Sequence, residues 1–233
     1  MENEIERAVR RVIEVMMENP GEQFTIDDLA RVAMFSKFHF SRIFRRTTGI
    51  PPGQFLSAIR LQEAKRLLLA TDASVAEICN EVGYSAVGTF STRFKHCVGA
   101  APTEYRRNGG AAPEAEEGTG EATVHGEIIA PGDGPPDLVC VGLFPDPIPE
   151  GRPARATVVR SPGPFTLERV PPGSWHLTAH SLTRPDRRRT GERGRRPVSL
   201  GRAALRIAPG ARVHRVDVPL RPKRLFDPPV LPA

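Results

Sequence analysis

The sequence has few cysteines and no long hydrophobic run. Its 233 residues include three cysteines, Cys79, Cys97 and Cys140, too few and too scattered for a disulfide framework or a zinc module. Cys79 and Cys97 lie among apolar residues of predicted helices, so we expect buried, reduced thiols. No apolar stretch reaches the roughly 18 residues that span a bilayer, and the acidic N-terminus followed by an amphipathic helix is not a signal peptide. We therefore expect a soluble, cytoplasmic protein that does not bind membranes.

Proline is scarce in the first half of the chain and abundant in the second. All but four of the 24 prolines lie after residue 108. The stretch that follows is small, acidic and without periodicity, as in a flexible linker. These changes predict a domain over residues 1–108, a linker over 109–122, a second domain over 123–222 and a Pro-rich tail over 223–233. The net charge of +6 favours a polyanionic partner without proving one.

The first half has the pattern of an all-α domain. Apolar residues recur at helical spacing over residues 5–16, and residues 54–70 (QFLSAIRLQEAKRLLLA) form one long predicted helix without internal Gly or Pro. Thr25 can cap the free backbone N–H groups at the start of another helix. Ser74 and Glu77 form a capping box at the start of a further predicted helix.

The second half alternates apolar and polar residues between Pro/Gly turns. This is the pattern of short antiparallel strands packed as a β-sandwich. About seven strands are predicted, over residues 124–130, 138–144, 156–160, 165–170, 174–179, 203–207 and 216–220. The predicted fold is therefore a helical domain followed by an all-β antiparallel sandwich.

An internal repeat is the most informative feature of the sequence. Residues 40–55 (FSRIFRRTTGIPPGQF) return fifty positions later as residues 90–105 (FSTRFKHCVGAAPTEY). The coinciding pairs are Phe40/Phe90, Ser41/Ser91, Phe44/Phe94, Arg45/Lys95, Gly49/Gly99, Pro52/Pro102 and Phe55/Tyr105. Each copy predicts a short capped helix, a tight turn and a second helix whose aromatics, four residues apart, pack on the core.

That arrangement is helix-turn-helix geometry. The outward positions of the second helices carry groups suited to phosphates and base edges. They are Lys37, Ser41, Arg42 and Arg45 in the first copy, and Ser91, Thr92 and Lys95 in the second. Two copies on one rigid helix could reach major-groove faces about 34 Å apart. The alternative, a plain helical scaffold with solvated charges, does not explain the doubled motif.

These residues resemble the AraC/XylS family of bacterial transcriptional regulators over about residues 5–107. The family's second-unit signature is similar to residues 75–85 (VAEICNEVGYS), followed by Phe90, Phe94, Gly99 and Tyr105. The resemblance implies a seven-helix domain whose third and sixth helices enter adjacent major grooves. It also implies double-stranded DNA and RNA polymerase as partners, with no cofactor and no metal.

The resemblance also assigns base contacts by motif position. They are Phe38, Ser41 and Arg42 in the first unit, and Val87, Gly88, Ser91 and Thr92 in the second. Val87 and Gly88 have no side-chain donors, so the second helix is expected to read thymine methyls, shape and phosphates. Met34 stands where many members have Gly and where the second copy keeps Gly83. Either Met34 is strained in a left-handed turn or this turn is built differently.

The second half resembles transthyretin-like, carboxypeptidase-regulatory-type sandwiches over about residues 123–220, mainly through residues 163–179. Such modules usually act as binding domains or as spacers. The sandwich is therefore expected to sense a small-molecule effector, contact a protein partner, or act as a spacer. Related hydrolases use a tyrosine-containing tail, but residues 227–233 contain no Tyr. We therefore expect no enzyme, the alternatives being an architectural DNA-binding protein or a DNA-tethered hydrolase.

Three weaker signals remain in the second half. His176 and His180 share a strand face but lie about 13 Å apart, too far to bind one metal ion together, although His214 or Cys140 could join one of them. Trp175 is expected in the sandwich core. Residues 184–197 hold seven arginines and two acids. They form either a solvated hairpin insert or an arm that contacts DNA phosphates.

Overall fold

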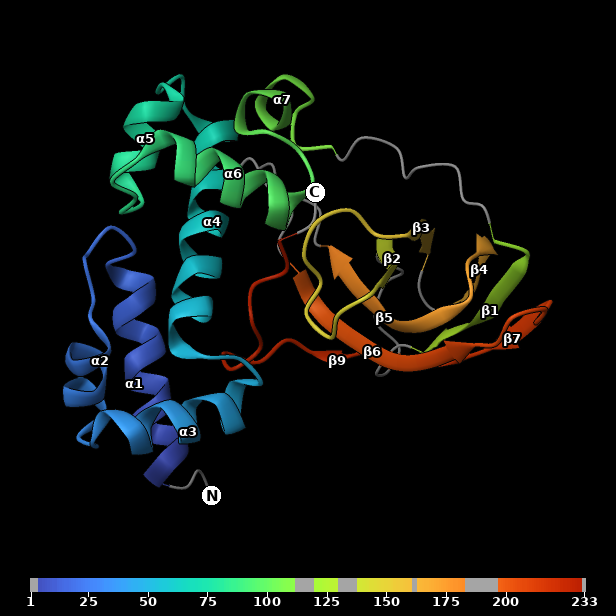
Figure 1. Cartoon of the computed structure of the whole chain (residues 1–233), viewed down its shortest axis with the longest axis horizontal. Coiled ribbons are helices and arrows are strands. Elements are labelled where there is room, and N and C mark those ends of the chain that lie inside the picture. The colour runs from blue at the N-terminus through green and yellow to red at the C-terminus, as the bar shows by residue number, and fades with distance from the viewer. Residues whose placement is uncertain (1–3, 112–119, 130–137, 161–162, 183–196, 232–233) are drawn as a thin grey trace. The chain divides into compact units, whose positions relative to one another are not determined.

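The computed structural model describes residues 4–111, 120–129, 138–160, 163–182 and 197–231 (Figure 1). The chain separates into two compact units. One unit comprises residues 1–94, 101–110 and 224–231, and the other comprises residues 95–100, 111–223 and 232–233. The first is helical and the second is a β-sandwich, which confirms the predicted fold class.

Seven helices are present in the described part of the first half, as predicted. They are α1 (Glu4–Glu18), α2 (Ile26–Ala33), α3 (Lys37–Thr48), α4 (Pro52–Ala70), α5 (Val75–Glu81), α6 (Val87–Val98) and α7 (Pro102–Arg107). None of the described helices is long and apolar enough to cross a membrane.

Capping boxes open α2 and α5. The Asp28 N–H donates to Thr25 Oγ1 (3.2 Å), and the Thr25 N–H donates back to the Asp28 carboxylate (3.0 Å). Ser74 and Glu77 make the same reciprocal pair at α5, at 2.7 and 3.2 Å. Each box satisfies backbone N–H groups that have no partner within the helix. The hydrogen bonds from Thr25 and Ser74 are the main reason that the pKa values of Asp28 and Glu77 lie below their usual range.

Equivalent aromatic clusters anchor α3 and α6. In the first copy, the Phe44 ring packs edge-on against Phe40 and Phe55, both at 5.5 Å between centroids. In the second, Phe94 lies 5.7 Å from Phe90 and 5.6 Å from Tyr105. All six rings are buried, so one edge of each helix is fixed to the core and the opposite edge is exposed.

The turn before α3 keeps the left-handed conformation despite its side chain. Met34 has φ +59° and Gly83, in the equivalent turn, has φ +82°. Hydrogen bonds repeat as well, from Phe35 N to Ala30 O (3.0 Å) and from Tyr84 N to Cys79 O (2.9 Å). Met34 is therefore the strained residue that the sequence offered as one of two possibilities.

Nine strands are described in the sandwich. They are β1 (Ala122–Ile129), β2 (Leu138–Phe144), β3 (Arg155–Arg160), β4 (Gly163–Val170), β5 (Gly173–Leu182), β6 (Pro197–Ile207), β7 (Val213–Arg215), β8 (Val218–Pro219) and β9 (Arg221–Pro222). One sheet has the order β4-β1-β7, with β8 also paired to β1, and the other has the order β3-β2-β5-β6-β9.

The segment from Val213 to Pro219 differs from the prediction of one strand over residues 216–220. β7 and β8 are separate short strands, and both run parallel to β1, so this sheet is mixed. The Val216 N–H still donates to His125 O at 2.9 Å. A break of this kind keeps the alternating pattern, which is why periodicity alone did not detect it.

The two sheets bury one apolar core. Val124, Phe165 and Leu167 contribute from one sheet, and Val141 and Leu177 contribute from the other. Trp175 packs partly buried against this core, where its indole N–H donates to Pro171 O at 2.9 Å. Its core position agrees with the sequence.

Two of the three free cysteines are buried as expected, Cys79 and Cys97. Cys140 is intermediate in exposure. Burial raises the pKa of the Cys79 thiol, which keeps it protonated and unreactive at neutral pH.

Candidate DNA-binding interface

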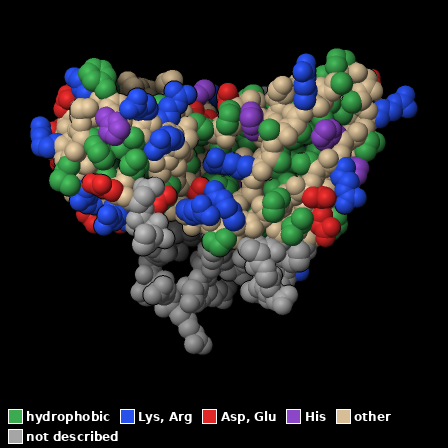
Figure 2. Space-filling view, turned by 90° about the horizontal axis from the view of Figure 1, so that it is seen from below, with side chains coloured by type: hydrophobic (Ala, Val, Ile, Leu, Met, Phe, Trp, Pro, Cys, Tyr) green, Lys and Arg blue, Asp and Glu red, His purple; other side chains and the backbone are tan. Residues whose placement is uncertain are grey.

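The exposed face of α3 gathers most of the side chains predicted for the first unit. An open hollow of about 670 Å³ is lined by Phe38, Ser41, Arg42, Arg45 and Arg46, with Gly49 and Pro51 at its end. Viewed from the end of the helical unit where α3 lies, Lys and Arg side chains alternate with hydrophobic ones (Figure 2). The surface can therefore offer both positive charge and apolar contact to a ligand.

Phe38 is the most exposed large hydrophobic side chain of this face. It is 80% exposed, and Lys37 Nζ lies 5.7 Å from its ring centroid. Lys37 also approaches Asp27 at 3.9 Å, with both side chains largely in solvent. Such a pair is weak in water, so a phosphate can replace Asp27 as the partner of Lys37.

Two polar side chains of α3 are held by the helix itself. The Ser41 hydroxyl donates to Lys37 O (2.8 Å), which leaves its oxygen lone pairs as acceptors. Arg42 Nη2 lies 3.2 Å from His39 Nδ1, one turn earlier. This contact orients the guanidinium without neutralising its charge.

Arg45 and Arg46 carry the free positive charge of the hollow. Both are exposed. Within the ranges that the structure describes, neither forms an ion pair with a carboxylate. They therefore add to the local positive potential, which attracts polyanions.

Arg46 and His39 were not predicted from the sequence. Arg42, Arg45 and Arg46 are spaced three and four residues apart, so helical periodicity could have placed all three on one face. His39 has a similar signal, three residues before Arg42. Comparison of the two repeat copies did not reveal Arg46, because the second copy has no matching cation at the equivalent position.

The exposed face of α6 is less polar at its start. Val87 is 42% exposed, and Gly88 and Thr92 are also exposed. Ser91 is intermediate, and Lys95 is exposed further along the helix. Adding a Cβ at Gly88 would meet no atom within 4 Å, so this glycine leaves open space at the surface rather than close packing.

The long helix α4 connects the two helix-turn-helix units within the helical part of the chain (Figure 1). Its 19 residues are roughly 28 Å long at 1.5 Å per residue, close to the ~34 Å turn of DNA. Arg60 on α4 donates to Pro20 O (2.9 Å) and Glu22 O (2.7 Å), and it lies 5.8 Å from the Tyr84 ring centroid. Gln23 Nε2 donates to Gly83 O at 2.8 Å. These contacts join the loop between α1 and α2 to the turn that precedes α6.

The weaker signals of the second half do not form a metal site in the described part of the chain. No group of three His, Cys, Asp or Glu side chains there is placed to hold an ion. His176 and His180 lie on the same face of β5, four residues apart. The arginine-rich segment 184–197 lies outside the described residues except for Pro197, as does most of the linker.

Two short helices joined by a tight turn, with the second helix exposed along one edge, define a helix-turn-helix unit, and this chain contains two. Residues 29–108 match the family described as "Helix-turn-helix domain". These residues form a helix-turn-helix domain of the AraC type.

Curated relatives match about two fifths of the chain. An uncharacterized HTH-type transcriptional regulator of Haemophilus influenzae is 37% identical over 93 residues, which is 40% of this chain and 31% of the relative. The transcriptional activator RclR of Escherichia coli is 35% identical, over 41% of this chain and 34% of its own. The activator AarP of Providencia stuartii is 31% identical, over 38% and 65%. The chain therefore spans about a third of the first two relatives.

Solved structures match less than half of the chain as well. The DNA-binding domain of AdpA in complex with a target DNA is 33% identical, with a TM-score of 0.42, and the match covers 43% of this chain and 90% of that one. A probable AraC family regulator from Rhodopseudomonas palustris is 28% identical, with a TM-score of 0.42 and coverage of 46% and 99%.

Proposed function

We propose that the protein is a sequence-specific DNA-binding transcriptional regulator that inserts α3 and α6 into adjacent major grooves of one duplex. The observation that carries this proposal is the hollow on α3, where Phe38, Arg42, Arg45 and Arg46 meet on an exposed face. The names of the relatives as transcriptional regulators and activators support it. RNA polymerase is the proposed protein partner, and the β-sandwich is proposed to sense an effector or bind a protein.

The side chains of α3 divide into base readers and phosphate binders. Arg42, oriented by His39, suits the two acceptors of guanine in the major groove. Ser41, whose proton is engaged by Lys37 O, is left to accept from the amino groups of adenine or cytosine. The face is completed by Lys37, Arg45 and the apolar Phe38. Phe38 is proposed to contact a thymine methyl group.

On α6 the proposed readout is mainly apolar. Val87 suits a thymine methyl, and Gly88 lets the DNA backbone or a base edge approach closely. Ser91 and Thr92 supply hydroxyls, and Lys95 supplies charge for a phosphate. The second helix is therefore proposed to contribute less sequence discrimination than α3.

Selection of bound sites from random DNA, using the full chain, tests this division. Arg42→Ala should lose about 1–3 kcal/mol of discrimination at one base position and relax the preference there. Lys95→Ala should instead weaken binding to all sequences and lower the slope of log affinity against log salt by about one.

Arg107→Ala is the matched control, because it removes an exposed cation outside both recognition helices. It should leave the selected sequence unchanged. Identical behaviour of the Arg42 and Lys95 variants would refute the division of roles. Failure of the unmodified protein to prefer any duplex over bulk competitor would refute the function itself.

A further inference from the structure

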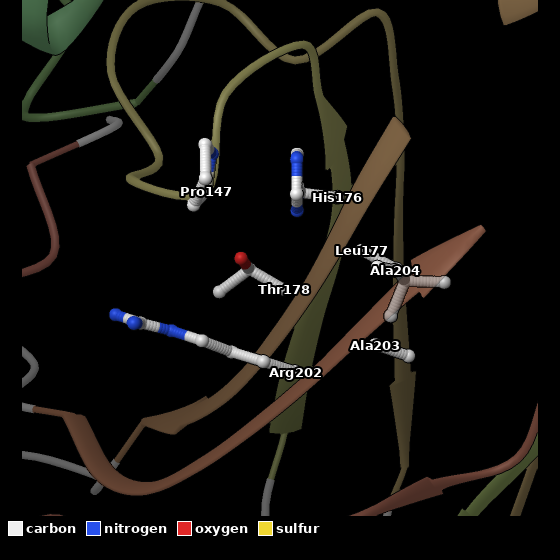
Figure 3. A pocket seen from close by; sticks show the side chains of 7 residues that line it. All are labelled: Pro147, His176, Leu177, Thr178, Arg202, Ala203 and Ala204. Carbon is white, nitrogen blue, oxygen red and sulfur yellow. The ribbon is translucent and has the colours of Figure 1, made fainter. Parts of the chain in front are cut away.

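A small pocket lies on the outer face of the five-stranded sheet of the sandwich (Figure 3). Leu177 and Ala179 of β5 point into the sandwich core. Strand alternation therefore directs His176 and Thr178 to the opposite face. The volume is about 210 Å³, roughly seven water-sized groups at ~30 Å³ each.

The strand pairing between β5 and β6 sets the lining of the pocket. Thr178 is directly opposite Arg202, and His176 is opposite Ala204. The short side chain of Ala204 leaves space beside the imidazole, and Pro147 from the loop after β2 closes the far side. Figure 3 shows the three polar side chains projecting from one face of the sheet, toward the side where Pro147 lies.

Thr178 is the most informative residue of the pocket. It is only 2% exposed, and no hydrogen bond of its side chain is found among the described residues. Its hydroxyl is directed toward the gap between Pro147 and His176 (Figure 3). The Thr178 oxygen is not among the fully buried side-chain atoms that lack a partner, so it keeps accessible surface on the pocket side, where water or a ligand can hydrogen-bond to it.

The chemistry of the lining favours a small anion with an apolar part. Arg202 brings a permanent positive charge, and Thr178 and His176 bring hydrogen-bonding groups. None of the described residues that line the pocket is acidic. The remaining walls are apolar and include Ala204 and Pro147, and one guanidinium balances a single negative charge better than the two of a phosphate.

We propose that this pocket binds a short-chain aliphatic carboxylate. The carboxylate accepts from Arg202 and from the Thr178 hydroxyl, and the alkyl chain lies against Ala204 and Pro147. The proposal deepens the sensing role proposed for the sandwich, because it names the chemical class of the ligand.

Saturation-transfer NMR titration of the full chain with sodium valerate, in a buffer free of phosphate and other carboxylates, tests the proposal. Valerate should bind, and its neutral isostere valeramide should bind at least tenfold more weakly. Thr178→Val and Arg202→Gln should each weaken valerate binding about tenfold, and Ala204→Leu should abolish it by filling the space beside His176.

Arg206→Gln is the matched control, because Arg206 lies on the same strand and face but outside the pocket. It should bind valerate as the unmodified chain does. Thermal melts of every variant check folding, and Thr178→Val, which nearly preserves volume, keeps the test valid if Ala204→Leu does not fold.

Several results would overturn the proposal. They are no detectable valerate binding, equal binding of valerate and valeramide, equal loss in the Arg202 and Arg206 variants, or competition by inorganic phosphate as strong as that by valerate itself. Preference for DNA is measured separately, without valerate. A protein that selects a DNA site but ignores valerate refutes only the pocket, whereas the converse refutes only the DNA-binding function.

Discussion

Met34 adopts the backbone conformation that the second copy of the repeat gives to Gly83. Its φ of +59° costs a side-chain-bearing residue about 1 kcal/mol. The side chain is 73% exposed, so it recovers little of that energy through packing. Met34→Gly should therefore raise the free energy of unfolding by about 0.5–1 kcal/mol, after the extra entropy of glycine in the unfolded chain is subtracted. Urea denaturation of the full chain, followed by the helical circular-dichroism signal, measures this change.

Gly83→Ala is the paired variant at the equivalent position. It should destabilise strongly, since a Cβ at Gly83 would lie 2.7 Å from Gly21 O and 3.0 Å from an Arg60 side-chain atom. Stabilisation by Ala at 83, or destabilisation by Gly at 34, would show that positive φ does not control the stability of these turns.

Residue-level prediction succeeded where the signal was local. Thr25 and Ser74 could be assigned as caps because a helix N-terminus needs acceptors within three residues. The aromatics at 40, 44, 90 and 94 could be assigned to the core because of their spacing. The contacts of Arg60 with Pro20 and Glu22 span about forty positions, and no sequence period points to them.

At the scale of elements, the segment after β9 has an unexpected place. Residues 224–231 group with the helical unit, although they follow the sandwich in sequence. Val230 and Leu231 are buried, Arg10 of α1 lies 5.6 Å from the Phe226 ring centroid, and Lys65 Nζ of α4 donates to Leu231 O at 2.8 Å. Composition predicted only a Pro-rich tail, because docking across 166 positions leaves no local pattern.

Docking of this segment gives the helical unit an unusual dependence on pH. Burial lowers the pKa of Lys65 from 10.5 to about 8. Between these values the unfolded chain keeps the Lys65 proton while the folded chain releases it. The unfolded state then binds more protons, so the contribution of Lys65 to the free energy of unfolding rises with pH, by about 3 kcal/mol in total.

The difference in unfolding free energy between the unmodified chain and Lys65→Met, measured from pH 7 to pH 10.5, isolates this rise. It should grow across that window. Lys95→Met, which replaces an exposed lysine, is the control and should give a nearly flat difference. A flat curve for Lys65→Met as well would show that burial does not lower the pKa of Lys65.

Tyr105, near Lys65, sets an upper limit to the pH range in which the Lys65 contribution acts alone. Burial raises its pKa from 10.0 to about 12, so the unfolded chain loses this proton first and stability falls as pH rises between those values. The two contributions oppose each other only near pH 10. Comparison with Lys65→Met cancels the tyrosine contribution, because both proteins carry it.

The sandwich shows where element prediction reached its limit. The positions of β2 and β4 followed from alternation bounded by turns, because each is a regular strand with one face in the core. β7 and β8 pair in parallel with β1 over three and two residues. Such short pairings depend on where the partner strand lies, which the local pattern does not encode.

For the whole molecule, the proposed function requires α3 and α6 to bind one duplex together. Each helix alone offers few contacts, and the second bound helix adds affinity only if the first holds it at the right distance. The components that fix this distance are α4 and the three contacts of Arg60, which connect the loop after α1, α4 and Tyr84. Burial lowers the pKa of Arg60, as expected for a guanidinium enclosed by its partners.

Arg60→Lys keeps the positive charge but loses the planar fork that reaches two carbonyls at once. It should lower the free energy of unfolding by about 1–2 kcal/mol and weaken binding to the selected DNA site roughly tenfold, because the two helices no longer share a fixed spacing. Since Arg60 contacts no base in this proposal, the preferred sequence should stay the same. Arg66→Lys, also on α4 and paired with Glu63 one turn earlier (2.6 Å), should change neither quantity. Weaker binding in both variants, or a changed base preference in Arg60→Lys, would mean that α4 affects DNA binding through charge or direct contact rather than through spacing.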